Sequence, residues 1–292
     1  MDGDAMSVYG LAVTGLGCEV GAFGVRSASD GPPGMPVLHV QQRLLTDHVP
    51  RFRSLNDHAA EVPLIESSWL SISRGPAATA TFQTTRVLDR AELLHPWLVP
   101  AAATVNVWNG RKVFHGGIVS DGECAVAIVG GKEAGKSSLL AWASAQPDLF
   151  VMADDLVVAD GRTIFAGPST VDLRLTSLAH LPNGTPGSCL VRGDTRARLV
   201  VPSGPPTAHL VGVVVLTWST VPALELRPVQ PADRLGHLLP HAMIGALPLG
   251  HAGVLDIVRY PTWQLSRPRD WVHMPEALTS LRSILSSAGA RP

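Results

Sequence analysis

Residues 124–145 read CAVAIVGGKEAGKSSLLAWASA, and this stretch decides the fold that we expect. Its first part, Cys124–Gly130, is apolar with little alternation, which is typical of a central strand covered on both faces. The part that begins at Lys136 is mostly apolar and predicts a helix. Between them, Gly130–Ser137 matches the pattern G-x-x-x-x-G-K-[ST]. The sequence therefore predicts a buried strand, a glycine-rich loop and a helix in succession.

The residue types of this loop suit the phosphates of a nucleotide. Gly130 and Gly135 let the backbone turn so that successive amides form an anion-binding nest, and the helix that follows adds its N-terminal dipole. Lys136 can bridge the β- and γ-phosphate oxygens, and the Ser137 hydroxyl can take one Mg²⁺ position. We expect ATP as the nucleotide, since no guanine-reading N/TKxD element is evident; the alternative is a chance glycine-rich turn. The expected cofactor-binding residues here are Gly130, Gly131, Lys132, Glu133, Ala134, Gly135, Lys136, Ser137 and Ser138.

A second buried strand, Leu149–Asp155 (LFVMADD), ends in two adjacent carboxylates. Neighbouring side chains of an extended chain project to different sides, so one carboxylate can face Mg²⁺ and the other the nucleophile. The sequence leaves open which of Asp154 and Asp155 is the base. A solvated pair at a strand end is the simpler alternative, and it weakens when the strand directly follows a phosphate-loop helix.

His115 lies on a predicted strand, Arg111–Val119, fifteen residues before the loop. A neighbouring strand could bring its imidazole beside the phosphates, although a histidine among apolar residues is as often structural. We expect Thr104–Trp108 to form the preceding strand and Asn109–Gly110 to form the hairpin turn. The remaining histidines have no metal-like spacing, and the sequence assigns them no role.

The chain before the loop contains two regions with different sequence patterns. Residues 1–90 contain glycine-rich turns and short predicted strands, such as Trp69–Ser73 and Ala80–Val87, so we expect a small β-rich region there. From Arg90 the spacing is helical, with breaks expected at Pro96 and Pro100. The predicted organisation is an N-terminal region of residues 1–90 and a catalytic domain of residues 91–292.

Composition excludes several classes of protein. The 292 residues are 46% hydrophobic, which is enough to build a core, and 23 Lys and Arg face 24 Asp and Glu. This balance gives no reason to expect nucleic acid as a partner. The strongest apolar run, Leu210–Trp218, is about half of the ~20 residues that cross a bilayer. Because no apolar run is long enough to cross a bilayer, we expect no membrane partner. The three cysteines show no metal-ligand spacing and suit a reducing compartment, so we expect a cytoplasmic protein.

Taken together, the motifs resemble the HPr kinase/phosphorylase superfamily. The segments HGG (His115–Gly117), GGKEAGKS (Gly130–Ser137), ADD (Ala153–Asp155) and DLRL (Asp172–Leu175) follow the order and approximate spacing of that family. The resemblance covers about residues 90–240. It implies an α/β fold with a P-loop-containing HPr-kinase-like core, in which a mixed, strongly β sheet has flanking helices.

The resemblance also implies roles for individual residues. His115 would lie near the γ-phosphate, and one of Asp154 and Asp155 would be the general base while the other helps the metal. Arg174 would belong to the active site, and Arg196 with Arg198 would clamp the phosphate or the acceptor, unless they are an exposed strand of alternating charge. The implied catalytic residues are Asp155, Asp154, His115, Lys136 and Arg174, and the implied metal ligands are Ser137, Asp154 and Asp172.

Two departures from the family affect the expected substrate. The loop centre is Lys132-Glu133-Ala134 instead of a serine-glycine pair, and LTSLAHL follows Arg174 in place of a glycine-rich signature. The chain looks closer to divergent members, including lasso peptide kinases of natural-product pathways. The implied activity is transfer of the γ-phosphoryl group of ATP, with Mg²⁺, to a hydroxyl of a peptide or protein, with serine favoured. Alternatives are a small-molecule kinase, for example for free serine, and a nucleotide-binding regulatory module without transfer; a homo-oligomer is a further expectation.

Overall fold

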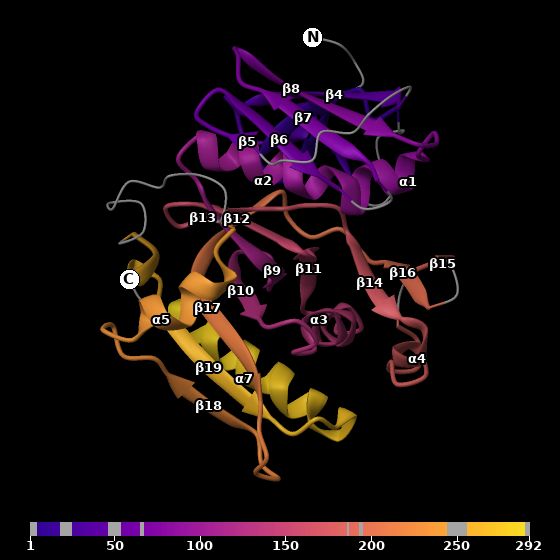
Figure 1. The fold of residues 1–292 in the computed structure, drawn as a ribbon. Coiled ribbons are helices and arrows are strands. Elements are labelled where there is room, and N and C mark those ends of the chain that lie inside the picture. Colours follow the sequence, from indigo (N-terminus) through magenta and orange to yellow (C-terminus); the bar gives the residue numbers. More distant parts are fainter. Residues whose placement is uncertain are drawn as a thin grey trace.

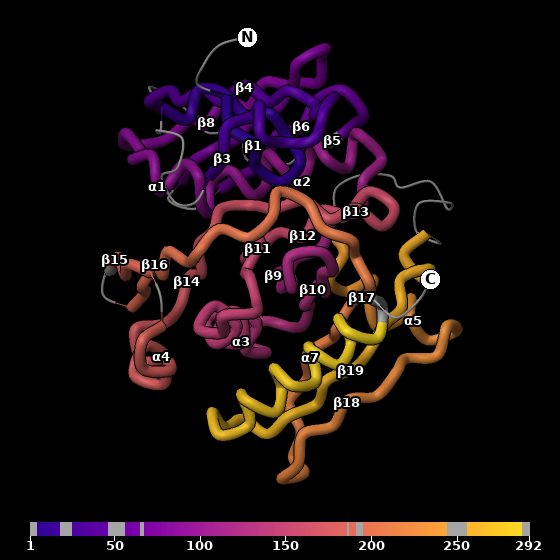
Figure 2. Tube along the Cα trace, turned by 180° about the vertical axis from the view of Figure 1, so that it is seen from behind, coloured from indigo at the N-terminus to yellow at the C-terminus, as the bar shows by residue number. Residues whose placement is uncertain are grey.

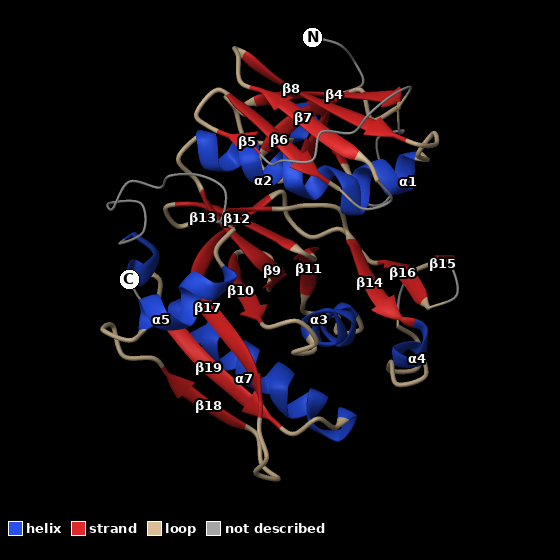
Figure 3. Cartoon of the chain, viewed as in Figure 1, coloured by secondary structure: helices blue, strands red, loops and turns tan. Residues whose placement is uncertain are grey.

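The computed structural model describes residues 5–17, 25–45, 54–64, 67–185, 187–192, 195–243 and 256–289. It is a mixed α/β structure in which strands outnumber helices (Figure 3). The N-terminal strands form one layer, helices α1 and α2 lie beneath them, and a second sheet follows (Figure 1). The view from behind has the same order of layers (Figure 2). The mixed α/β class expected from the sequence is confirmed at this level.

The first sheet has eight strands in the order β3-β1-β2-β4-β8-β7-β6-β5. Along β8 every second residue is buried, so one face of the sheet packs on the core and the other meets solvent. The strand expected at Trp69–Ser73 is confirmed, and the one expected at Ala80–Val87 begins and ends three residues earlier. The bounds are β1 (Met6–Val8), β2 (Leu11–Thr14), β3 (Arg26–Ser27), β4 (Val37–Leu44), β5 (Ser54–Leu55), β6 (Ala59–Pro63), β7 (Trp69–Ser73) and β8 (Ala77–Thr84).

The segment between the two sheets is helical from Arg90, as expected, and it is interrupted beside Pro96, where His95 has a non-helical backbone. The strand expected at Thr104–Trp108 is wrong. After α1 (Arg90–Glu92) and a π-helical turn (Leu93–Trp97), α2 runs over Leu98–Trp108 and includes the five residues predicted as a strand. Pro100 does not break α2, because the backbone N–H groups of a helix's first turn need no intrahelical acceptor. Four of the last five residues of α2 are buried, and the Asn106 amide donates to the carbonyls of Tyr9 and Ala102. Burial between two sheets overrides the short alternating pattern that had predicted a strand.

Asn109 and Gly110 end this helix instead of forming a hairpin turn. Asn109 is the C-cap of α2, and Gly110 has φ +80°. A glycine in the left-handed region just after the last helical residue is a common helix terminator, because it has no Cβ to clash there. The same dipeptide therefore changes the chain direction, but after a helix.

The second sheet contains the predicted central strand. Its order is β10-β9-β12-β13-β17-β19-β18, with β11 beside β9, and an additional pairing of β10 with β17 closes five of these strands on themselves. The pairs β10–β17 and β17–β19 are parallel, so these three strands end at the same edge. The bounds are β9 (Lys112–Ser120), β10 (Cys124–Gly130), β11 (Phe150–Ala153), β12 (Leu156–Asp160), β13 (Thr163–Phe165), β17 (Thr207–Trp218), β18 (Glu225–Pro228) and β19 (Thr262–Arg267).

The strand predicted at Cys124–Gly130 is covered on both faces, as its composition indicates. Ala127 and Val129 belong to a hydrophobic cluster that continues through α2 to the N-terminal sheet. Val126 and Ile128 point the other way, into a second cluster formed with α3 (Lys136–Ser144) and α7 (Met274–Gly289). Because α2 shares its core with both sheets, the division of the chain at residue 90 stays a prediction.

Smaller elements complete the described part of the chain. A three-stranded sheet in the order β14-β16-β15 lies beside α3 and carries the predicted DLRL segment. No helix in the described ranges is long and apolar enough to cross a membrane. The remaining bounds are β14 (Thr170–Arg174), α4 (Leu175–Leu178), β15 (Cys189–Arg192), β16 (Arg196–Val200), α5 (Arg234–Leu238) and 3-10 turns at Ala28–Asp30, Leu239–His241, Asp256–Arg259 and Trp271–His273.

Candidate active site

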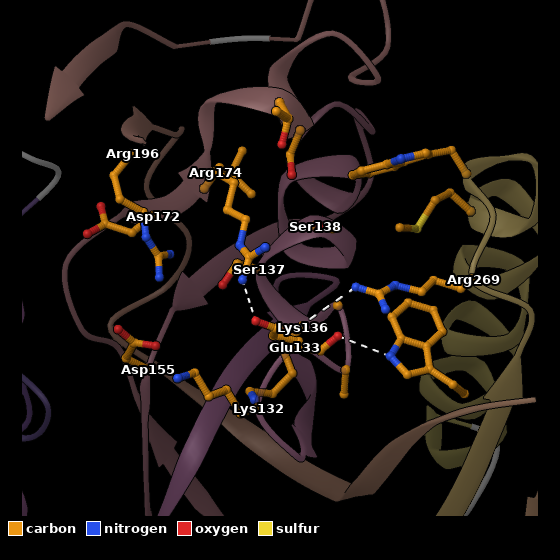
Figure 4. A pocket seen from close by; sticks show the side chains of 18 of the residues that line it. Lys132, Glu133, Lys136, Ser137, Ser138, Asp155, Asp172, Arg174, Arg196 and Arg269 are labelled. Carbon is orange, nitrogen blue, oxygen red and sulfur yellow. Dashed lines mark hydrogen bonds and ion pairs between the residues drawn. The ribbon is translucent and has the colours of Figure 1, made fainter. Parts of the chain in front are cut away.

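A cleft of about 760 Å³ lies where β10, β17 and β19 end, with the glycine-rich loop in it (Figure 4). The edge at which parallel strands end is where α/β proteins commonly bind ligands. Most of the residues singled out from the sequence line this cleft: His115, Lys132, Glu133, Ala134, Gly135, Lys136, Ser137, Ser138, Asp155, Asp172, Arg174 and Arg196. The structure adds His95, Trp218, Arg267, Arg269 and Trp271 to the lining.

The loop has the backbone of an anion-binding turn. Glu133 and Gly135 adopt left-handed conformations with φ +65° and +85°, and α3 begins directly afterwards at Lys136. The Lys136 ammonium donates to the carbonyls of Gly130 (2.9 Å) and Gly131 (3.2 Å), so it lies across the loop. Burial lowers the pKa of Lys136, as expected for an ammonium that has left bulk water. Phosphate oxygens in the cleft would meet this charge together with the N-terminus of α3.

Trp218, the last residue of β17, supports the loop from one side. Its indole Nε1 donates to the carbonyl of Glu133 at 3.1 Å. The Trp218 ring also approaches Gly135, where an added Cβ would lie 3.1 Å from the ring and 2.4 Å from the Arg267 guanidinium. A glycine is therefore required at position 135 both for its backbone conformation and for space.

Asp154 is buried beneath the loop, next to Ser137. Its Oδ1 accepts a hydrogen bond from the Ser137 hydroxyl at 3.3 Å, and the residue is only 3% exposed. Burial, with repulsion from Asp155 as the second cause, raises the pKa of Asp154 to about 7. A carboxylate held in this way would be stabilised by a nearby cation, and a hydroxyl with a carboxylate is the donor set that holds nucleotide-bound Mg²⁺ in phosphate-loop proteins. Ser137 and Asp154 therefore fit Mg²⁺.

Asp155 turns away from Asp154 and into the cleft. Its backbone is left-handed, with φ +68°, and its carbonyl is 3.1 Å from the His115 Nδ1 and accepts from the Gly116 N–H at 3.3 Å. The Asp155 side chain is 33% exposed, whereas Asp154 does not line the cleft. The structure thus separates the twin carboxylates: Asp154 faces Ser137, and Asp155 faces the space where an acceptor would enter.

His95 is the central residue that sequence reasoning missed. It comes from the turn between α1 and α2, is 3% exposed, and lies between two carboxylates of the cleft. Its Nε2 is 2.9 Å from Asp155 Oδ2, and its Nδ1 is 3.3 Å from Asp172 Oδ2. A histidine followed by proline in a helical stretch gave no signal for this role, because only the packing of α2 against the second sheet brings it to the cleft.

The two carboxylates keep His95 charged. Burial acts against protonation, but hydrogen bonds to Asp155 and Asp172 outweigh it and raise the pKa of His95 to about 9. In the imidazolium form Nε2 donates to Asp155 and Nδ1 donates to Asp172. Arg198 Nη2 also lies 2.9 Å from the His95 Nδ1. It donates instead to the His95 carbonyl at 2.7 Å and to Asp172 Oδ2 at 3.0 Å, so it does not need Nδ1 as an acceptor. The same His95 contact lowers the pKa of Asp155 against the opposing effect of burial.

Asp172 corrects one expectation about the metal. Its Oδ1 accepts from Arg198 Nε at 2.7 Å, and its Oδ2 faces His95 and Arg198. These hydrogen bonds outweigh burial and lower the pKa of Asp172 well below its usual range. Both oxygens therefore already meet cationic groups, so Asp172 does not fit as a metal ligand. Within the described ranges, no group of three or more His, Cys, Asp or Glu side chains is arranged to hold a metal ion by itself.

The two arginines of β16 have different positions. Arg196 is exposed and lines the cleft, as a phosphate or acceptor clamp would. Arg198 is only 1% exposed, lies outside the cleft lining, and directs its guanidinium to Asp172, His95 and the Ala91 carbonyl. The expectation that Arg198 binds the cofactor directly is therefore corrected: it positions His95 and Asp172.

Arg174 and Arg269 approach Glu133, in the middle of the loop, from opposite sides. Both pair with Glu133, Arg174 through a close hydrogen-bonded contact and Arg269 at 4.0 Å (Figure 4). Arg174 is 56% exposed and Arg269 is 70% exposed, so neither pair contributes much to stability. Both arginines belong to the lining of the cleft, so their charges face the space beside the loop.

Fold and site together define a mixed α/β protein in which a strand–loop–helix segment and a buried carboxylate–histidine network meet at one cleft. No family model matches the chain, and no curated protein matches it. Among solved structures, the chain is similar to the Hpr(Ser) kinase/phosphatase from Coxiella burnetii, at 12% sequence identity and a TM-score of 0.30. That match covers 59% of this chain and 93% of the other. An identity and a TM-score this low say nothing about the activity of this chain.

Proposed function

We propose that this protein is an ATP-dependent phosphotransferase that moves the γ-phosphoryl group to a hydroxyl, with serine in a peptide or protein as the favoured acceptor. One observation carries the proposal: the loop with Lys136 and Ser137 and the carboxylate of Asp155 line the same cleft. A phosphate-binding loop alone is compatible with hydrolysis, transfer or simple binding. A partly exposed carboxylate in the same cleft adds a group that can accept the proton of an entering hydroxyl.

The side chains divide the work in the following way. The loop amides and Lys136 bind the phosphate chain, and Ser137 with Asp154 would hold Mg²⁺, which when bound neutralises charge on the phosphate oxygens. Asp155, held by His95, orients the acceptor hydroxyl and takes its proton as the new P–O bond forms. The bond from the γ-phosphorus to its bridging oxygen breaks, and ADP leaves with the negative charge. Arg174 and Arg196 are within the cleft to offset charge on the transferred group.

Exposure on the acceptor side favours a peptide or protein. Asp155 is one-third exposed, and Arg174 and Arg196, which line the same cleft, are exposed as well. A free metabolite would gain most from an enclosed pocket that buries 70–90% of its surface. We therefore favour a serine on an extended peptide, including the precursor peptide of a natural-product pathway, over free serine.

The test is transfer from ATP labelled at the γ-phosphorus to a library of serine-containing peptides, with free serine as a separate arm. We expect label in one or more peptides and equal release of ADP. Lys136→Ala should abolish both binding and transfer, and Lys112→Ala is the matched control, because Lys112 pairs with Asp256 and lies outside the cleft lining. Label in free serine alone would assign a small-molecule kinase. Tight ATP binding without transfer to any acceptor would contradict the proposal and assign a nucleotide-binding module.

A further inference from the structure

Arg267, the last residue of β19, is a buried cation that no carboxylate of the described residues neutralises. The residue is 2% exposed, and its Nε and Nη2 have no hydrogen-bond acceptor within the part of the chain that the structure describes. Buried polar groups are almost always paired, and an unpaired charged group is the most costly exception. Arg267 nevertheless belongs to the lining of the cleft that holds the glycine-rich loop.

The surroundings of Arg267 position the guanidinium without neutralising it. Its guanidinium carbon lies 4.4 Å from the centre of the Trp218 ring, and its Nη2 lies against Gly135 on the side from which a side chain would project. Burial alone lowers the pKa of Arg267 to about 10, with no carboxylate acting in the opposite direction. The nearest acidic residue of the loop, Glu133, is already engaged by Arg174 and Arg269.

An anion in the cleft would complete this arrangement. Stacking on Trp218 fixes the plane of the guanidinium, and a planar guanidinium donates two parallel hydrogen bonds to phosphate oxygens. The Lys136 ammonium lies inside the loop, where it donates to the Gly130 carbonyl. The Arg267 guanidinium lies beside Gly135, at the other end of the loop. The two cations would therefore contact a bound phosphate chain from different directions. A neutral ligand would leave the Arg267 charge uncompensated, so the site is suited to a polyanion.

We propose that Arg267 is a phosphate-binding residue of the nucleotide site, whose guanidinium donates to oxygens of the bound phosphate chain on the Trp218 side of the loop. This inference rests on the proposed nucleotide binding, and it adds a ligand residue far along the chain from the loop motif. It also implies that the unliganded protein carries the cost of an uncompensated buried charge, which the nucleotide removes.

The experiment measures ATP affinity by calorimetry in the full-length wild type, Arg267→Met, Arg267→Lys and the control Arg227→Met. Arg227 lies on the neighbouring strand β18, is 71% exposed and is outside the cleft lining. We expect Arg267→Met to weaken ATP binding roughly 10–100-fold, the value of a charge-assisted hydrogen bond, and Arg267→Lys to weaken it less. Arg227→Met should bind as the wild type does. The affinity of Arg267→Met should also fall less steeply with added salt, because one ion pair to the phosphates is gone.

Melting temperatures without nucleotide separate a ligand role from a structural one. Met fills a similar volume without the buried charge, so unliganded Arg267→Met should melt at the wild-type temperature or above it. Wild-type ATP affinity and salt dependence in folded Arg267→Met would overturn the inference and leave the proposed function intact. Failure of both Arg267 variants to fold without nucleotide would overturn it too, since the charge would then be needed by the protein itself. No ATP binding by the wild type would overturn the proposed function and this inference together.

Discussion

His95→Gln is the most informative single substitution, because it removes a buried charge while keeping a side chain of similar size. His95 has a pKa of about 9 in the folded protein, against about 6.5 in an unfolded chain. A group whose folded pKa is raised contributes stability that is complete below the unfolded pKa and is lost as the pH rises through the folded pKa. The relevant window therefore runs from pH 6.5 to pH 9.

The expected magnitude follows from these two pKa values. Linkage gives a contribution of roughly 2–3 kcal/mol at pH 7 and close to zero at pH 9.5. His95→Gln should therefore lower the free energy of unfolding by about 2–3 kcal/mol at pH 7, and the difference from the wild type should nearly vanish at pH 9.5. Asp154 titrates in the same window and the His95 charge lowers its pKa, so Asp154 contributes to the pH dependence of this difference.

Urea denaturation of both proteins at pH 7 and pH 9.5 measures the effect. His58→Gln is the matched control, because His58 is exposed in a turn of the N-terminal sheet and should show no difference at either pH. An equal loss of stability at both pH values would refute the reasoning, since it would mean that His95 is uncharged between Asp155 and Asp172. In that case an ion pair with a charged His95 could not be what holds the Asp155 carboxylate in the cleft.

Three further predictions follow from the same site. Asp155→Asn should bind ATP normally and slow phosphoryl transfer by roughly 10²–10⁴-fold, as loss of a general base does; a wild-type rate in the transfer assay would place the base elsewhere. Asp154→Asn should bind ATP without the Mg²⁺ dependence of the wild type in calorimetry. The variant should also gain stability relative to the wild type between pH 4 and pH 8, measured as the difference between their free energies of unfolding. The sign follows because the Asp154 pKa is raised to about 7, so the wild type loses stability as the pH rises from about 4 through 7; an equal difference at both pH values would contradict it. Gly135→Ala should lose roughly 1–2 kcal/mol from its left-handed backbone alone and bind ATP poorly, whereas Gly236→Ala, with open space around it, is the control; unchanged melting and binding in Gly135→Ala would contradict this.

The network around His95 connects four residues that are distant in sequence. His95 comes from the helical segment that packs between the sheets, Asp155 from the turn between β11 and β12, and Asp172 from the small sheet. Arg198 joins them by donating to Asp172 and to the His95 carbonyl. Substitutions in the α1–α2 segment can therefore change the orientation of Asp155 although this segment contributes no phosphate ligand. A buried network of this kind is stable only when each member keeps its partner.

Dense local patterns were predicted well. The central strand Cys124–Gly130 has the bounds expected from its composition, and the helix that begins at Lys136 follows the loop as expected. These features depend on neighbours in sequence, so a single sequence contains enough information to predict them.

Features that depend on packing were predicted poorly. Thr104–Trp108 alternates like a strand over five residues, yet it is the end of a helix buried between two sheets. The sequence predicted that Asp154 and Asp155 project to different sides, but it did not predict that Asp155, which has a left-handed backbone, is the one that lines the cleft. Asp172 and Arg198 were given ligand roles because they resemble a family pattern, but they are engaged with each other and with His95.

The sequence by itself determined that a glycine-rich loop lies between a buried strand and a helix, and that a carboxylate pair follows on the next strand. Glycine positions, apolar runs and a lysine–serine pair depend on residues that are close in sequence, so the sequence alone is enough to recognise them. Only the tertiary structure decided which carboxylate enters the cleft, and only it brought His95 and Arg267 to the loop from 35 residues before and 137 residues after Gly130. Their roles arise from burial and from the charges that face them, and both quantities exist only when the chain is folded.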